Sequence, residues 1–172
     1  MLTLLKLLQS LFKTLHSEGT PGQVAAGIML GAGIGLTPLM SAHNLVLFAA
    51  IVLLNVSFGG GMLGMALFTP VGFLLDPLFD KVGLALLKAA PLQGLWTDWY
   101  NIPLVPYTNF NNSVTLGSFV VWLVLTIPLY FLGKVAIARY RATYGARVMN
   151  SKLMKGIKAS RVYNVYSWFR PE

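Results

Sequence analysis

Few side chains in this sequence could carry out acid–base or metal chemistry. The 172-residue chain has no cysteine, two histidines and five acidic residues. These candidates are His16, His43, Glu18, Asp76, Asp80, Asp98 and Glu172. The two histidines have neither the spacing of a zinc site nor a paired carboxylate that would complete a catalytic triad. The sequence therefore predicts no catalytic residue, no metal and no cofactor, and we expect that the protein is not an enzyme.

A second set of polar side chains lies near the two ends of one apolar stretch. Its members are Ser41, His43, Asn44 and Asn55. Polar groups at membrane depth are costly unless they are bonded, so they are functional candidates by default. We interpret the four as lining a polar path. The alternative is that they only form hydrogen bonds between helices, with His43 as an ordinary helix-end histidine.

The composition is that of a membrane protein. Hydrophobic residues make up 56% of the chain and charged residues 10%, against roughly 25% charged in soluble domains. No Asp, Glu, Lys or Arg occurs between Gly19 and Leu75. The formal charge of +8 is carried by the segment after Gly133, so the high isoelectric point describes a tail rather than a nucleic-acid surface. We expect an all-α integral membrane protein with membrane lipids, and no nucleic acid, as partners.

The apolar core, residues 19–90, begins with the helix-start signal Thr20-Pro21. Gly27, Gly31 and Gly35 then recur every four residues and so share one helix face. Small residues at this spacing let membrane helices approach closely. This glycine zipper predicts a protein partner or a homo-oligomer that packs on the glycine face.

Glycine and proline also predict broken or re-entrant helices in this core. The expected breaks are Thr37-Pro38, Gly59-Gly60-Gly61 and Thr69-Pro70, and Asp76-Pro77 is expected to open a separate interfacial helix. Irregular backbone at membrane depth must be covered by protein or line a wet cavity. The two Thr-Pro pairs lie 32 residues apart, as do Asn44 and Asp76. Paired interruptions of this kind mark substrate sites in repeat-built transporters.

The remaining segments predict how the chain meets the membrane. Residues 1–18 form an amphipathic interfacial helix, 91–113 an external aromatic loop, 114–133 a clear transmembrane helix and 134–172 a basic tail. The positive-inside rule then places the C-terminus in the cytoplasm. Four regularly spaced basic residues of the tail are expected to contact anionic lipid: Lys152, Lys155, Lys158 and Arg161.

A family resemblance accompanies this pattern. The residues that carry it are Pro21, Ala26-Gly27, Gly31, Gly35, Pro38, Asn55, Pro70, Pro77 and Gly83. From about Gly19 to Leu87 the chain resembles a family of small bacterial inner-membrane proteins catalogued as a domain of unknown function, family twenty sixty-two. That family usually has Asn-Pro where this chain has Thr69-Pro70. The resemblance implies a bacterial inner membrane and no particular activity.

Together these features predict a small, multi-pass inner-membrane subunit of an envelope complex. In the first hypothesis, its broken helices form part of a pathway for lipid or small-solute movement. In the alternative, it is a non-transporting membrane anchor or assembly subunit for a larger partner.

Overall fold

The computed structural model describes residues 19–149, which are all-helical with no strand in that range. The helices are α2 (Pro21–Leu36), α3 (Ala42–Leu53), α4 (Phe58–Lys88), α5 (Gln93–Asn101) and α6 (Ser113–Met149), with short 3₁₀ turns η1 (Ala90–Leu92) and η2 (Val105–Thr108). The predicted helix over 1–18 falls outside the described residues, as do the residues predicted to contact anionic lipid, Lys152, Lys155, Lys158 and Arg161.

Helix α2 begins and ends where the sequence predicts. The Gln23 backbone N–H donates to the Thr20 hydroxyl (3.2 Å), and the Thr20 N–H donates to the Gln23 side-chain oxygen (2.6 Å), which completes a capping box. At its other end, α2 stops at Leu36, directly before Thr37-Pro38. A steric clash with the proline ring disfavours helical backbone angles at the preceding residue, here Thr37. This predicted break is therefore confirmed.

The glycine row packs α2 against α4 of the same chain. An added Cβ at Gly31 would overlap the carbonyl oxygen of Gly61, and one at Gly27 would overlap that of Ser57. The contact is reciprocal, because a Cβ at Gly64 would overlap the carbonyl oxygen of Ile28. Since residue numbers rise together along both helices, α2 and the first half of α4 run parallel. The predicted glycine face is thus occupied within the chain.

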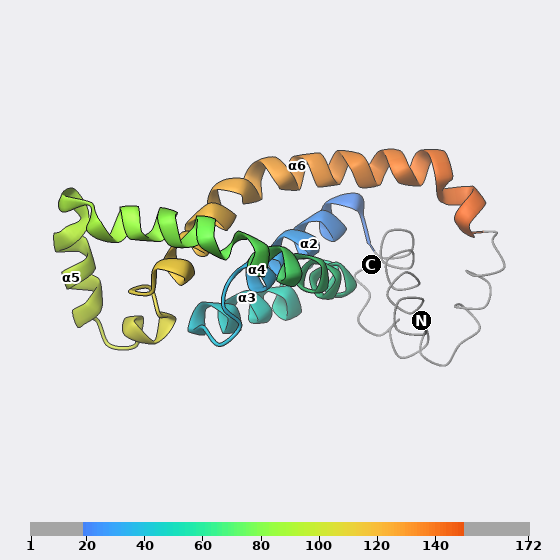
Figure 1. The fold of residues 1–172 in the computed structure, drawn as a ribbon. Helices are drawn as coiled ribbons and strands as arrows, with labels where there is room; N and C mark the ends of the chain where they lie inside the picture. The colour runs from blue at the N-terminus through green and yellow to red at the C-terminus, as the bar shows by residue number, and fades with distance from the viewer. Residues whose placement is uncertain (1–18, 150–172) are drawn as a thin grey trace.

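Helix α6 lies antiparallel to both of these helices, along one side of α2 (Figure 1). Gly33 of α2 faces the ring of Trp122, whose indole N–H donates to the Met29 carbonyl oxygen (2.8 Å). Near the start of α6, an added Cβ at Gly117 would overlap the carbonyl oxygen of Phe79 in α4. Helix α6 continues well past the predicted boundary at residue 133.

Two of the expected breaks are wrong, because α4 is one 31-residue helix. It starts after Ser57, whose hydroxyl accepts the Gly60 backbone N–H (2.8 Å). Gly59, Gly60 and Gly61 are therefore helical rather than a turn, and they are buried where their missing side chains allow close packing. Thr69-Pro70 and Asp76-Pro77 also lie inside α4, so no separate helix starts at Asp76. Prolines are tolerated within membrane helices where neighbouring groups satisfy the freed backbone.

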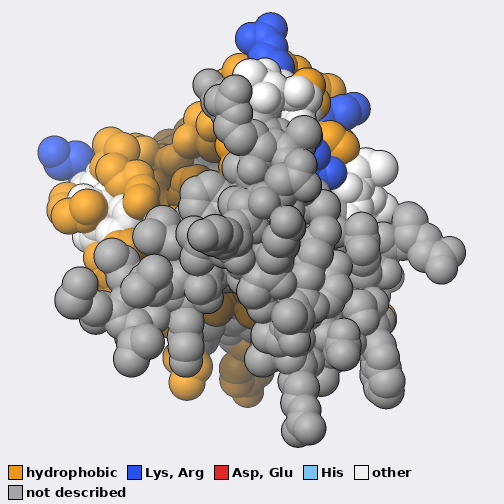
Figure 2. Space-filling model, turned by 90° about the vertical axis from the view of Figure 1, so that its right-hand side faces the viewer, with side chains coloured by type: hydrophobic (Ala, Val, Ile, Leu, Met, Phe, Trp, Pro, Cys, Tyr) orange, Lys and Arg blue, Asp and Glu red, His pale blue; other side chains and the backbone are white. Residues whose placement is uncertain are grey.

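Helices α4 and α6 are long and apolar enough to cross a membrane, over Phe58–Lys88 and Ser113–Thr143. In the most apolar 18-residue stretch of each helix, only 33% of the residues of α4 and 11% of those of α6 are buried. A core helix of a soluble protein is mostly buried. From the end of the molecule where α6 finishes, the described side chains visible in Figure 2 are largely hydrophobic, with Lys and Arg at the edges. The aromatic segment 91–113, predicted as a loop, contains α5 and η2.

Candidate functional site

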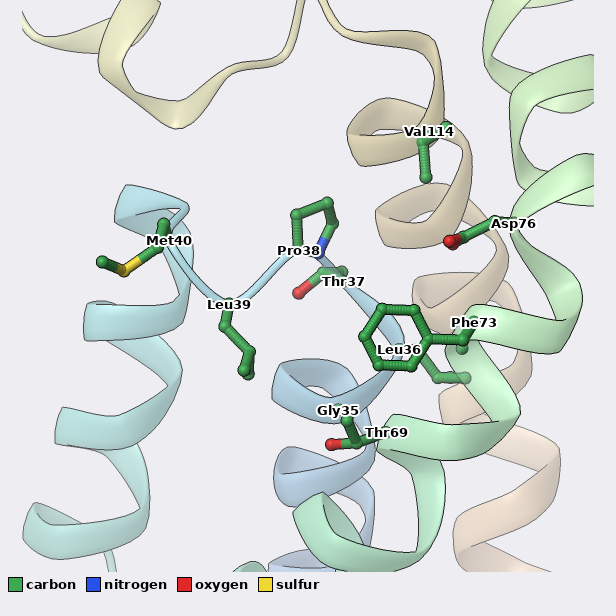
Figure 3. Close-up of a pocket in the computed structure, with 11 residues that line it drawn as sticks. Gly35, Leu36, Thr37, Pro38, Leu39, Met40, Thr69, Phe73, Asp76 and Val114 are labelled. Atoms are coloured by element: carbon green, nitrogen blue, oxygen red, sulfur yellow. The ribbon is translucent and has the colours of Figure 1, made fainter.

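A groove lies where the end of α2 meets the middle of α4, beside Thr37-Pro38 and Thr69 (Figure 3). Its volume is about 380 Å³. It is lined by Gly35, Leu36, Thr37, Pro38, Leu39, Met40, Thr69, Gly72, Phe73, Asp76 and Val114. The groove therefore joins the end of α2, the middle of α4 and the first turn of α6.

On the α2 side of the groove, the buried side-chain amide of Asn44 forms hydrogen bonds with Thr37 and Pro38. The Thr37 hydroxyl lies 2.9 Å from both the Gly33 carbonyl oxygen and the Asn44 side-chain oxygen, either of which can accept its proton. The Asn44 side-chain nitrogen donates to the Pro38 carbonyl oxygen (2.9 Å). These bonds satisfy polar groups of the irregular backbone between α2 and α3. Asn44 therefore holds this turn in place.

The α4 side of the groove contains Thr69, whose hydroxyl donates to the Met65 carbonyl oxygen (2.7 Å). This local bond adds a polar contact next to Pro70, which has no N–H to donate. Both threonine hydroxyls are thus directed to main-chain or amide oxygens. Their bonding leaves the groove walls predominantly apolar.

Asp76 is the charged residue of the groove. It is half-buried, and its carboxylate points towards the hollow (Figure 3). Within residues 19–149 the carboxylate has no hydrogen bond or ion pair. By contrast, Asp80, one turn further along α4, accepts a hydrogen bond from the Ser113 hydroxyl. The site thus combines apolar walls with one negative charge that the described chain does not neutralise.

The rim of the groove is apolar and exposed. Leu39 is 55% exposed, Met40 95% and Phe73 72%. A water-filled catalytic cleft would more often present polar groups at its mouth. This rim suits contact with an apolar molecule or with a bilayer.

The four residues of the predicted polar path are not brought together. Asn44 bonds the turn between α2 and α3. His43 instead packs against Phe119 (ring centroids 5.2 Å apart), and its Nε2 atom is buried with no hydrogen-bond partner in the described part of the chain. Ser41 is buried next to them, with no hydrogen-bond partner for its hydroxyl in the described part of the chain.

Asn55 lies beyond the opposite end of α3, where its side-chain oxygen accepts from the Gln23 amide (2.9 Å). A second hollow there, of about 460 Å³, is lined by Gln23, Asn55, Tyr130 and Lys134 among others. Asn55 therefore belongs to the end of the molecule where α2 starts, away from Asn44.

Asp76 was missed as a groove residue by the reasoning from sequence, which treated it as a helix cap. The available signal was the shared 32-residue offset between the two Thr-Pro pairs and between Asn44 and Asp76. In the structure Thr37, Thr69 and Asp76 line the groove, whereas Asn44 lies behind Thr37 and is bonded to its hydroxyl. Among the described residues, no group of three or more His, Cys, Asp and Glu could hold a metal ion.

The fold and the site define a helical protein with span-length apolar helices and a groove between them. The chain belongs to the family described as "Uncharacterized protein conserved in bacteria (DUF2062)", whose model matches residues 5–144. It is 29% identical over 138 residues to an "Uncharacterized protein" of Treponema pallidum (strain Nichols), which covers 80% of this chain and 85% of that protein. No solved structure matches the chain. The family resemblance seen in residues 19–87 is confirmed and extends over most of the chain.

Proposed function

We propose that this chain is a multi-pass protein of the bacterial inner membrane that binds a lipid or lipid-like molecule in the groove and takes part in its movement within an envelope complex. The observation that carries the proposal is the groove itself. It has apolar walls, an exposed apolar rim and one polar end at Asp76. Ligand sites are typically concave, mostly apolar and equipped with few polar groups, and this site has that form.

The membrane assignment is supported by the distribution of exposed apolar side chains. On α3 they include Leu45, Val46 and Leu53, and on α6 they include Val124 and Ile127, all at least 66% exposed. Exposed apolar surface this extensive marks a membrane or protein contact. The basic residues from Lys134 onwards favour a cytoplasmic C-terminus. Arg141 donates to the Gly19 carbonyl oxygen (2.7 Å), so the start of α2 would lie on that same side.

The lengths of α2 and α3 support a re-entrant arrangement of these two helices. Their 16 and 12 residues extend about 24 Å and 18 Å, whereas a hydrocarbon core is about 30 Å thick. We infer that the pair enters from the cytoplasmic side and turns back at Pro38–Met40. The groove would then lie at membrane depth, where a lipid could enter sideways past Phe73.

The anchor hypothesis would need a different surface from the one predicted for it. The glycine face is packed on α4, so a protein partner would have to dock elsewhere. The exposed face of α3, with Phe48, Val52 and Leu53, is the surface that favours this alternative.

Photocrosslinking from two matched phenylalanines tests the proposed function. A benzophenone amino acid is introduced at Phe73 on the groove rim or at Phe131 on the exposed surface of α6. After irradiation of cells and purification, intact-mass spectrometry should find a defined lipid-like adduct on the Phe73 variant. The Phe131 variant should give a mixture of bulk lipids at low yield. The same adduct profile at both positions would contradict the proposal.

A further inference from the structure

We propose that the groove selects a molecule whose head carries a positively charged ammonium group, and that Asp76 is the residue that binds this group. The inference rests on the proposed function and adds the chemical class of the ligand. It is carried by the half-buried Asp76 carboxylate, which is directed into an otherwise apolar groove (Figure 3).

The charge of Asp76 is not neutralised by the protein in the part that the structure describes. Among residues 19–149, no Lys, Arg or His lines the groove, and the Asp76 carboxylate forms no ion pair. Removing a carboxylate from water is unfavourable unless a partner compensates it. The neighbouring Asp80 accepts a hydrogen bond from the Ser113 hydroxyl, which links α4 to α6. Asp76 has no such partner among the described residues.

The groove favours an organic ammonium over a metal ion. Magnesium and calcium need several oxygen ligands, whereas no cluster of three metal-binding side chains exists among the described residues. A quaternary ammonium group has no N–H donor to satisfy, so one close carboxylate is enough and apolar or aromatic surroundings suit its other sides. Leu39, Met40 and Phe73 then supply a surface for an attached hydrocarbon tail.

The ammonium group could belong to a lipid or to a water-soluble amine, and a titration separates these sources. The full chain in neutral detergent is titrated with dodecyltrimethylammonium, dodecyl sulfate, dodecanol or tetramethylammonium, and bound molecules are counted by native mass spectrometry. We expect dodecyltrimethylammonium to bind most tightly. Asp76→Asn should weaken it about tenfold or more, because it removes one partner of a charge pair.

Two further variants make the result specific to this carboxylate. Asp98→Asn removes the same charge from exposed α5 and should leave binding unchanged, whereas Asp76→Glu keeps the charge and should retain most of it. The melting temperature of each variant without ligand reports folding separately from binding.

Each outcome has a distinct meaning. If no amphiphile binds, both the proposed function and this inference are wrong. If dodecanol and dodecyl sulfate bind as well as the ammonium compound and Asp76→Asn changes nothing, the groove remains a lipid site but the ammonium assignment is overturned. If tetramethylammonium binds as tightly as its dodecyl derivative, Asp76 binds an ammonium group whose source is a water-soluble amine.

Discussion

The backbones of Gly31 and Gly61 are in direct contact, so that no side chain fits between α2 and α4 at this level. This contact fixes the two helices side by side and in parallel. It also places Thr37-Pro38, at the end of α2, near Thr69 in the middle of α4, and these residues line two sides of the groove. The packing of helices in lipid depends on such close approach of small residues.

Gly31→Ala should therefore destabilise the fold, although alanine is the better helix former. The added methyl group would overlap the Gly61 carbonyl oxygen, and overpacking of this kind costs about 1–3 kcal/mol. Gly133→Ala is the matched control, because its Cβ would lie 3.7 Å from the nearest atom, that of Ala25. Thermal unfolding in detergent should show a drop of several degrees for Gly31→Ala alone. Equal melting temperatures would refute the α2–α4 contact.

Trp122→Phe should weaken the attachment of α6 to α2. The substitution removes the indole donor, whereas the Met29 carbonyl oxygen keeps its place in the hydrogen-bond ladder of α2, so the expected cost is that of one hydrogen bond, about 0.5–1.5 kcal/mol. Trp99→Phe in α5 is the control, because Trp99 is 39% exposed. Denaturant titration followed by circular dichroism should find Trp122→Phe less stable. If the Trp99→Phe variant is equally unstable, the hydrogen bond of Trp122 is not what attaches α6 to α2.

Asn44→Ala should destabilise the protein more than Asn55→Ala. Asn44 is 6% exposed and bonds both Thr37 and the Pro38 carbonyl, whereas Asn55 is exposed and bonds Gln23. The expected difference is about 1–2 kcal/mol, because the bonds of Asn44 are buried or partly buried, whereas water can replace the exposed bond between Asn55 and Gln23. Proteolysis rates in detergent provide the comparison. Faster cleavage of the Asn55→Ala variant would contradict this assignment.

The sequence predicted local features better than it predicted which segments would meet. The capping box at Thr20 and the end of α2 before Thr37-Pro38 depend only on neighbouring residues, and the structure has both as the sequence predicts. The triple glycine and Thr69-Pro70 were misread as breaks, because their helical state depends on packing against α2 and on the Thr69 hydroxyl bond. Asn55 is predicted to share one polar path with Asn44 because both are polar residues of the same apolar stretch, whereas the length of α3 separates them. Tertiary contacts that override local preference were not visible from one sequence.

The proposed orientation places Asn111 outside the cytoplasm and Ala142 inside it. Both positions are exposed, and the chain has no native cysteine, so single-cysteine variants report cleanly. A membrane-impermeant maleimide added to spheroplasts should label Asn111→Cys, whereas Ala142→Cys should react only after the membrane is opened. If Ala142→Cys is labelled in spheroplasts and Asn111→Cys only after the membrane is opened, the topology is the reverse of the proposed one and the positive-inside assignment is wrong.

Lipid labelling of the reconstituted full chain tests the groove most directly. The protein is placed in vesicles with a lipid that carries a diazirine in its tail, irradiated and mapped by peptide mass spectrometry. The proposed function predicts that labels, corrected for exposure, concentrate on Leu39, Met40 and Phe73 at the groove rim, above the level on the exposed α6 residues Val124, Phe131 and Leu132. Labelling of both sets in proportion to their exposure would show that lipid only surrounds the protein, and would contradict a lipid site in the groove.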